Sequence, residues 1–287
     1  MSTEEVAMNS VYAIPIADDD SSESRLETSR IQFHNILVAT DFSIYARAAL
    51  DAAIAIARRS GGKLFLLHAA IPPVLYSLEA GMVTPELLQA NAEAAEAKMR
   101  DFTKHKPELS AIVHREILSS LPVVDAINQQ VAEKAIDLIV VGTHGASGVE
   151  KLALGSVAES VLRASSRPVM LVGPNANTTH SAFESVVLAT DLGLGSLRAA
   201  QYASAIAEEE NARLTVLTVV PREAHARGEP RTLIEQRLRT ALRQLLPSDS
   251  ELWCRPSLRV EFGDPQEQIV AVVKEQAAGL LVIGVRP

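Results

Sequence analysis

The sequence has little of what several classes of protein depend on, beginning with cysteine. Its 287 residues include a single cysteine, Cys254, which excludes an internal disulfide and a metal site built from several cysteines. Lone cysteines are rarely catalytic, so we interpret Cys254 as a structural residue.

Long apolar runs and basic patches are also missing. No stretch reaches the roughly eighteen apolar residues that a membrane-spanning helix needs, and the N-terminus has no basic region followed by a long apolar segment. The formal net charge is −8 and no basic stripe reverses it, so nucleic acid and anionic lipid would be repelled. We therefore expect a cytoplasmic protein with neither a nucleic acid partner nor a membrane partner.

What the sequence does contain is enough apolar residues for a buried core. Hydrophobic residues make up 47% of the chain and charged residues 22%, and the length favours about two domains. Residues 1–30 differ, because they include an acidic and polar run from Asp18 to Ser24. Such a segment cannot bury enough apolar surface to offset its ordering entropy, so we expect a disordered acidic tail there.

An internal repeat is the most informative feature of the sequence. Residues 36–41, Ile-Leu-Val-Ala-Thr-Asp, recur as Val-Val-Leu-Ala-Thr-Asp at 186–191, an offset of 150. A second match, offset by 142, pairs residues 137–142 with 279–284. We therefore predict one domain at residues 31–174, a second and shorter one at 183–287, and a polar linker at 175–182.

Each copy alternates short β-branched runs with longer segments of helical spacing. Helices are predicted from Ser43, as N-cap, to Gly61-Gly62, and over 85–102, 123–135 and 156–165. Strands are predicted at 36–39, 64–68, 138–141 and 169–172; their continuous apolar runs suit parallel strands covered on both faces. The pattern predicts an α/β fold with two tandem parallel-sheet units of the five-stranded type.

A glycine-rich segment follows the strand predicted at 138–141. Its pattern is Gly142-x₂-Gly145-x₉-Gly155-Ser156, and a helix begins at its end. Glycine lets a backbone approach phosphate oxygens closely, because it has no Cβ and tolerates positive φ. A helix amino end also favours a phosphate, and the Ser156 hydroxyl adds a donor. The pattern indicates an anion site; the alternative is that these glycines only shape a surface loop.

Three further polar residues of the first unit have two interpretations each. Asp41 would face the same crevice as Gly142 if their strands are neighbours, and it would equally serve as a cap of the following helix. His144 either shapes the glycine loop or contacts a ligand. His68, at a strand end, is better explained by packing than by ligand binding.

Three segments together resemble the ATP-binding members of the universal stress protein family. They are Ala39-Thr40-Asp41-Phe42-Ser43, Leu66-Leu67-His68-Ala69 and the glycine pattern from Gly142 to Ser156. The resemblance covers residues 33–173 and, more weakly, the chain from residue 183. It implies a five-stranded parallel sheet in the order 3-2-1-4-5, the adenine nucleotide alpha hydrolase-like fold.

The resemblance also implies where ATP would bind, with Mg²⁺ or Mn²⁺ as an accompanying cation. Adenine would lie near Asp41 and the main chain of Ala69, beside Ala39 and Thr40. The ribose and phosphates would contact Gly142, Thr143, His144, Gly145, Gly155, Ser156 and Val157. No side chain is assigned as a catalytic residue or as a metal ligand.

The second unit departs from this pattern. Asp191 is present, but Leu-Gly-Leu-Gly follows it in place of Phe-Ser, and the sequence ends three residues after Gly284. We therefore expect the second unit to lack the phosphate loop and the fifth strand, and to be unable to bind ATP.

The sequence has no recognisable catalytic set. It shows no paired general acid and base near the loop, no activated nucleophile and no Walker-type Gly-x₄-Gly-Lys-Ser/Thr segment. The favoured hypothesis is a regulatory ATP-binding protein of the stress response with an unidentified protein partner. The alternatives are a nucleotide-using enzyme, such as a slow ATPase or a nucleotidyl or adenylyl transferase, and an interaction module with an empty loop.

The first unit also has a strand that the second unit is expected to lack. Val169 to Val172 form its apolar fifth strand, which in the family lies at the sheet edge and often pairs across a two-fold axis. An open apolar edge invites pairing, so we predict a homodimer in which Val169 to Val172 of two chains lie antiparallel. The alternative is a monomer in which the linker or the second unit covers that edge.

Overall fold

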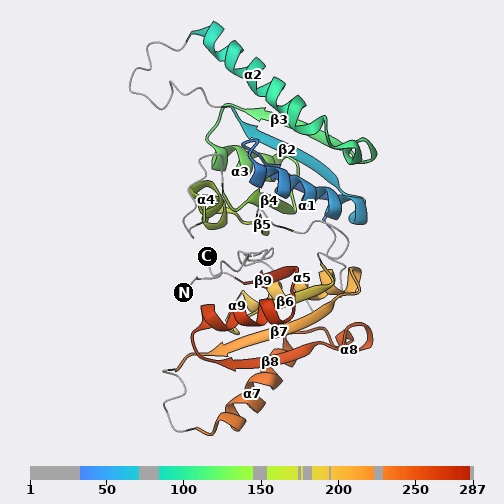
Figure 1. The fold of residues 1–287 in the computed structure, drawn as a ribbon, viewed down its shortest axis with the longest axis vertical. Coiled ribbons are helices and arrows are strands. Elements are labelled where there is room, and N and C mark those ends of the chain that lie inside the picture. Colours follow the sequence, from blue (N-terminus) through green and yellow to red (C-terminus); the bar gives the residue numbers. More distant parts are fainter. Residues whose placement is uncertain are drawn as a thin grey trace, which may run out of the picture. The chain divides into compact units, whose positions relative to one another are not determined.

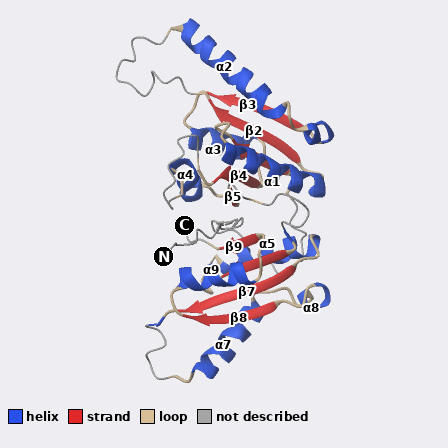
Figure 2. Ribbon diagram, viewed as in Figure 1, coloured by secondary structure: helices blue, strands red, loops and turns tan. Residues whose placement is uncertain are grey.

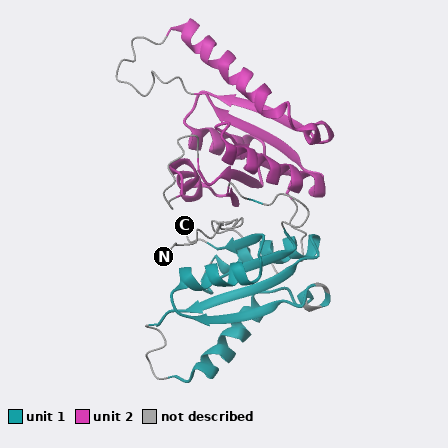
Figure 3. Cartoon of the chain, in the orientation of Figure 1, with its two compact units in different colours: residues 1–31, 175–287 teal, residues 32–174 magenta. Residues whose placement is uncertain are grey.

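The computed structural model describes residues 33–70, 84–144, 154–173, 176, 183–193, 195–222 and 229–284. The expected tail over residues 1–30 and nearly all of the expected linker lie outside these ranges. The chain divides into two compact units (Figure 3), which we call the N-terminal unit, residues 32–174, and the C-terminal unit, residues 175–287.

The N-terminal unit is built on five strands in the order β3-β2-β1-β4-β5 (Figure 1). These strands are β1 (Asn35–Ala39), β2 (Lys63–Ala69), β3 (His114–Ser119), β4 (Leu138–Gly142) and β5 (Val169–Val172). Every neighbouring pair is parallel. The predicted α/β fold class and strand order are confirmed.

Helices pack along this sheet, as Figure 2 shows. They are α1 (Ile44–Ser60), α2 (Pro85–Thr103), the short 3-10 helix η3 (Pro107–Ala111), α3 (Val123–Glu133) and α4 (Ser156–Ala164). Helix α1 begins where predicted, because Ser43 Oγ accepts a hydrogen bond from the Ala46 N–H. It ends at Gly61, whose φ of 66° lies in the left-handed region that favours glycine.

The strands at the centre of the sheet are buried on both faces. Ile36, Leu37 and Val38 of β1 have no exposed surface, which accounts for their continuous apolar run. Strand β3 lies at the sheet edge and is only partly buried. Its polar sequence, His-Arg-Glu-Ile-Leu-Ser, gave no apolar run, so the sequence predicted no range for it.

The C-terminal unit has a four-stranded parallel sheet in the order β8-β7-β6-β9. Its strands are β6 (Ser185–Ala189), β7 (Arg213–Val220), β8 (Ser257–Phe262) and β9 (Leu280–Ile283). Its helices are α5 (Ser196–Glu209), α7 (Arg231–Gln244), α8 (Ser250–Trp253) and α9 (Pro265–Glu275). This unit repeats the first four strands of the N-terminal unit, as the sequence repeat predicts.

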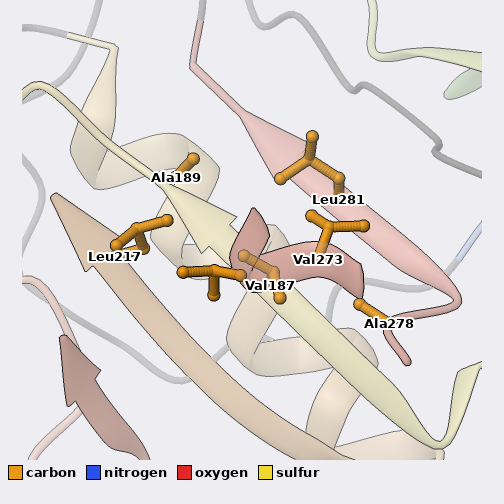
Figure 4. Close-up of a cluster of buried hydrophobic side chains, with 7 residues drawn as sticks. Val187, Ala189, Leu217, Val273, Ala278 and Leu281 are labelled. Carbon is orange, nitrogen blue, oxygen red and sulfur yellow. The ribbon is translucent and has the colours of Figure 1, made fainter. Parts of the chain in front are cut away.

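A cluster of aliphatic side chains joins α9 to this second sheet. Val187, Ala189, Leu217 and Leu281 of the strands meet Val273 of the helix and Ala278 after it (Figure 4). All of them are at most 6% exposed. The cluster fixes the position of α9, whose first residue lies at the carboxyl edge of the sheet.

The described residues bear on two expectations, that the chain has no membrane-spanning helix and that Cys254 is a structural residue. None of the helices there is long and apolar enough to cross a membrane. Burial raises the pKa of the Cys254 thiol to about 11, so the group stays protonated at neutral pH and is a poor nucleophile. This agrees with a structural role for Cys254.

Candidate functional site

The order of the strands reverses between β1 and β4 of the N-terminal unit. From β1 the chain moves outward through β2 and β3, whereas β4 and β5 lie on the other side. Asp41 follows β1 and Gly142 ends β4, and these two strands are direct neighbours. Ligands of open parallel sheets bind beyond the carboxyl ends of the strands at such a reversal. Asp41 was predicted to face the same crevice as Gly142 if their strands are neighbours, and the sheet order meets that condition.

The turn after β1 is held by its own side chains. Thr40 Oγ1 accepts a hydrogen bond from the Phe42 N–H at 2.9 Å, and Asp41 Oδ1 accepts one from the Ser43 N–H at 3.0 Å. These bonds hold Phe42 at a φ of 67°, which is unfavourable for a large side chain. Asp41 therefore stabilises the turn and does not cap the helix as the alternative interpretation had it, since Ser43 is the N-cap of α1; its exposed position leaves it accessible to a ligand.

The same turn recurs in the C-terminal unit. Thr190 Oγ1 accepts from the Leu192 N–H at 3.0 Å, Asp191 Oδ1 accepts from the Gly193 N–H at 2.7 Å, and Leu192 has a φ of 61°. The Thr-Asp pair thus forms the same turn in both units. Its presence alone does not identify a nucleotide site.

Gly142 has a packing role that the sequence analysis missed. A Cβ on Gly142 would lie 2.8 Å from the main-chain carbon of Tyr45, in the first turn of α1. In the C-terminal unit, a Cβ on Gly284 would lie 2.8 Å from the main-chain oxygen of Gly195. Neither glycine has a positive φ. At Gly142 the positive-φ argument is therefore wrong; the strand needs glycine because a helix start packs directly against it.

The ends of the glycine loop are brought together by main-chain hydrogen bonds. The Thr143 N–H donates to the Val172 carbonyl at 3.0 Å, and the Gly155 N–H donates to the Thr143 carbonyl at 2.8 Å. Gly145 lies outside the described residues. The pairing places Gly155 and the start of α4 beside the end of β4, as an anion site at this crevice requires.

The amino end of α4 has no side-chain cap. Gly155 is its N-cap, with φ −62° and ψ 147°, and it supplies no side-chain hydrogen bond. Most residues can adopt this backbone conformation, so the positive-φ argument fails here as well. Ser156 and Val157 of the first turn are exposed. The first N–H groups of a helix have no acceptor within the helix and favour an anion.

The two histidines of the N-terminal unit have different surroundings. His68 Nδ1 is hydrogen-bonded to the Thr40 carbonyl at 2.8 Å, and its ring lies 4.3 Å from that of Phe42. Burial lowers the pKa of His68, so it is neutral at pH 7 and packs against the turn. His144 Nδ1 is 3.1 Å from Thr143 Oγ1, and its ring lies 5.2 Å from that of Tyr45. His144 thus helps to shape the start of the loop.

The remaining predicted residues lie at the same edge of the sheet. Ala39 ends β1, and Ala69 ends the neighbouring β2. The Asn91 amide of α2 donates to the carbonyl of Ala70 at 2.6 Å, which fixes the chain just after β2. Apart from Gly145, all the predicted site residues therefore lie at the carboxyl ends of β1, β2 and β4 or at the start of α4.

The described residues do not include a group of three or more His, Cys, Asp or Glu side chains placed to hold a metal ion.

Comparisons with known proteins agree with this fold. The chain is 30% identical over 146 residues to the universal stress protein YxiE of Bacillus subtilis, covering 49% of this chain and 99% of that protein. It is 35% identical over 145 residues to a universal stress protein of Thermus aquaticus, covering 49% and 98%. A crystal structure of a universal stress protein from Archaeoglobus fulgidus aligns over 88% of both chains, with a TM-score of 0.67 and 20% identity. That identity supports the fold alone.

The model of the universal stress protein family matches the chain twice, at residues 32–173 and 182–287. Both matches coincide with the two parallel-sheet units. The chain therefore belongs to the universal stress protein family, with two copies of its domain in tandem.

Proposed function

We propose that the protein is an ATP-binding regulatory protein, in which the N-terminal unit holds the nucleotide and the C-terminal unit does not. The observation on which this depends is the open amino end of α4. The hydrogen bond between Gly155 and Thr143 holds it beside the end of β4. Phosphates would accept hydrogen bonds from the first N–H groups of α4 and from the Ser156 hydroxyl.

The other end of the crevice would take the base and the sugar. Asp41 is exposed beside β1, and the main chain of Ala69 lies at the end of β2, next in the sheet. Mg²⁺ or Mn²⁺ would bind chiefly through the phosphates. The chain would thus grip ATP at both ends with groups already fixed by the fold.

Two exposed apolar side chains next to this crevice support a regulatory role. Ile44 follows Ser43 at the start of α1 and is 67% exposed, and Val157 follows Ser156 and is 43% exposed. Both belong to helix turns that a bound nucleotide would contact. Nucleotide binding would therefore change the surface that an unidentified protein partner meets.

Calorimetric titration of the full chain with MgATP tests the site. We expect one ATP per chain, and we expect Gly155→Val to abolish binding, because its side chain would occupy the phosphate approach. Gly173→Val is the matched control, since a Cβ there meets nothing within 4 Å. Unchanged affinity in Gly155→Val would refute the assignment.

Turnover separates the regulatory proposal from the enzyme alternative. His68 Nδ1 is hydrogen-bonded to the Thr40 carbonyl, and Asp41 Oδ1 is hydrogen-bonded within the turn. Neither is placed as a base for an attacking water, so we expect ATP turnover far below the enzyme median of about 10 s⁻¹. A sustained rate near that median, lost in Gly155→Val, would favour the enzyme.

A further inference from the structure

A cavity of about 600 Å³ lies at the carboxyl edge of the sheet in the C-terminal unit. Its lining combines residues of β6, β7 and β9 with side chains of α7 and the start of α9. Its volume is within the range of small-molecule sites in proteins. The cavity lies in the unit that the sequence predicted to be unable to bind ATP.

The floor of this cavity is apolar and packs against the core of the unit. Ala189 and Leu217 line it and also belong to the buried cluster of Figure 4. Val219, Ile269 and Ile283 line it as well and pack against the same cluster. An apolar molecule would therefore meet a surface that is already formed, so little ordering would oppose its binding.

The charges around the cavity disfavour an anion. Among the described residues, those of the lining that carry charge are Asp191, Glu229 and Arg237, with a formal sum of −1. Arg237 donates from Nη1 and Nη2 to the two carboxylate oxygens of Glu229, at 2.8 and 3.2 Å. The guanidinium is thus already paired with a carboxylate.

The helix that begins at this cavity also offers little to a phosphate. Pro265, its first residue, lines the cavity and has no N–H. Asp264 caps the helix, since its Oδ1 accepts a hydrogen bond from the Glu267 N–H at 3.0 Å. A carboxylate therefore occupies the place that an anion would take, in contrast to the open start of α4.

Two side chains that line this cavity are smaller than those at the matching positions of the N-terminal unit. Phe42 and His68 pack ring against ring beside β1 and β2. The repeat places Leu192 and Thr218 at the corresponding positions, and both line the cavity. Replacing two rings by an aliphatic side chain and a hydroxyl opens the crevice on this side.

We propose that this cavity binds an uncharged, predominantly apolar small molecule with one or two rings, and that it excludes phosphate-bearing ligands. The apolar floor provides most of the contact. An anion would find the Arg237 guanidinium already paired with Glu229 and the start of α9 already capped by the Asp264 carboxylate. The proposal is independent of ATP binding in the N-terminal unit.

A pair of related dyes tests both parts of the proposal on the full chain. N-phenyl-1-naphthylamine is uncharged, and its 8-sulfonate has the same rings with a negative charge; both fluoresce more strongly in apolar sites. We expect saturable binding of the uncharged dye, with the sulfonate at least about tenfold weaker. Saturating ATP should not displace the uncharged dye. Equal affinity for the two dyes, or displacement by ATP, would overturn the proposal.

Substitutions in the lining test whether the dye binds in this cavity. Leu238→Trp adds bulk to a lining residue of α7 and should weaken binding by at least about tenfold. Leu233→Trp makes the same change at a position on that helix that is 53% exposed and does not line the cavity, and it should leave binding unchanged. The double variant Leu192→Phe with Thr218→His fills the cavity from the sheet side and should also weaken binding. Dye binding that none of the lining substitutions weakens would contradict this location.

Discussion

The turn after the first strand has the same hydrogen bonds in both units, but among the described residues only the N-terminal unit continues past its fourth strand, into α4 and β5. Asp41 and Asp191 each accept from the N–H two residues on, and Gly142 and Gly284 each pack against a helix start. After its fourth strand the N-terminal unit adds α4, which has no side-chain cap. Helix α9 of the C-terminal unit precedes the fourth strand of its sheet, so it corresponds to α3, and it is capped by Asp264.

This comparison separates residues that serve the fold from residues that serve a ligand. A feature present in both units, such as the Thr-Asp turn or the glycine that ends the central strand, is explained by packing. Gly155-Ser156 at the start of α4 has no counterpart among the described residues of the C-terminal unit, and the phosphate binding that we propose would account for it.

The largest expected difference between the units is their response to ATP. ATP at a hundred times its Kd should stabilise the N-terminal unit by about 2.7 kcal/mol and the C-terminal unit not at all. Hydrogen exchange with and without MgATP measures this, because protection should rise in β1, β4 and α4 and stay unchanged in β6, β9 and α9. Equal protection in the two units would show that the difference at the helix starts does not decide binding.

The two packing glycines should respond alike to substitution. Gly142→Ala and Gly284→Ala each force a Cβ to within 3 Å of main-chain atoms, and each should lower the free energy of unfolding by about 1–3 kcal/mol. Chemical denaturation followed by hydrogen exchange would assign each loss to its unit. Gly173→Ala is the control and should have no such effect, since its Cβ meets open space.

Strand β5 is a further difference, because only the N-terminal unit has it among the described residues. It pairs with β4 at the edge of the sheet, and its four side chains are at most 6% exposed. No strand of the described residues pairs with the outer side of β5, so we keep the prediction of a homodimer formed by antiparallel pairing of Val169 to Val172. The bonds from Ile139 N–H to the Pro168 carbonyl and from Thr143 N–H to the Val172 carbonyl place the Leu171 N–H on that outer side. Leu171→Pro removes this donor and should shift the dimer to a monomer in sedimentation, while ATP binding is largely kept. A wild-type chain that stays monomeric at high micromolar concentration would refute the prediction.

The elements that the sequence predicted well are those whose local pattern and tertiary environment agree. Buried central strands produce continuous apolar runs, and Ser43 and Gly61 are residues that helix ends favour. Strand β3 was missed because an edge strand with one solvated face needs no apolar run.

The sequence predicted that Asp41 and Gly142 lie at the same edge if their strands are neighbours, and β1 and β4 are neighbours. It did not predict that Gly142 packs against Tyr45, because a contact between residues distant in sequence has no local signal. The match of Gly142 with Gly284 was the available hint, since the second unit was expected to lack the loop. The cavity of the C-terminal unit could not be predicted, because its apolar lining comes from segments spread over residues 189–284.

The smallest expected effect is on the pH dependence of stability. It concerns the end of the second strand, where the N-terminal unit has His68 and the C-terminal unit has Thr218. Burial lowers the pKa of His68, and the charge of Lys98 acts in the same direction, while the bond to the Thr40 carbonyl and the charge of Asp41 oppose the shift. The unfolded chain therefore binds a proton more readily than the folded one. The stability that His68 contributes is present above its ordinary pKa of 6.5 and is lost as the pH falls through the lowered value.

His68→Asn isolates this contribution, because an asparagine amide can donate to the Thr40 carbonyl but does not titrate. Thermal unfolding from about pH 8 to about pH 5 should show a steeper loss of stability in the wild type than in the variant. Thr218→Asn, at the matching position of the C-terminal unit, should leave the slope unchanged. Parallel curves for the wild type and His68→Asn would show that His68 keeps its ordinary pKa in the folded chain, and its burial against Phe42 would then have no electrostatic consequence.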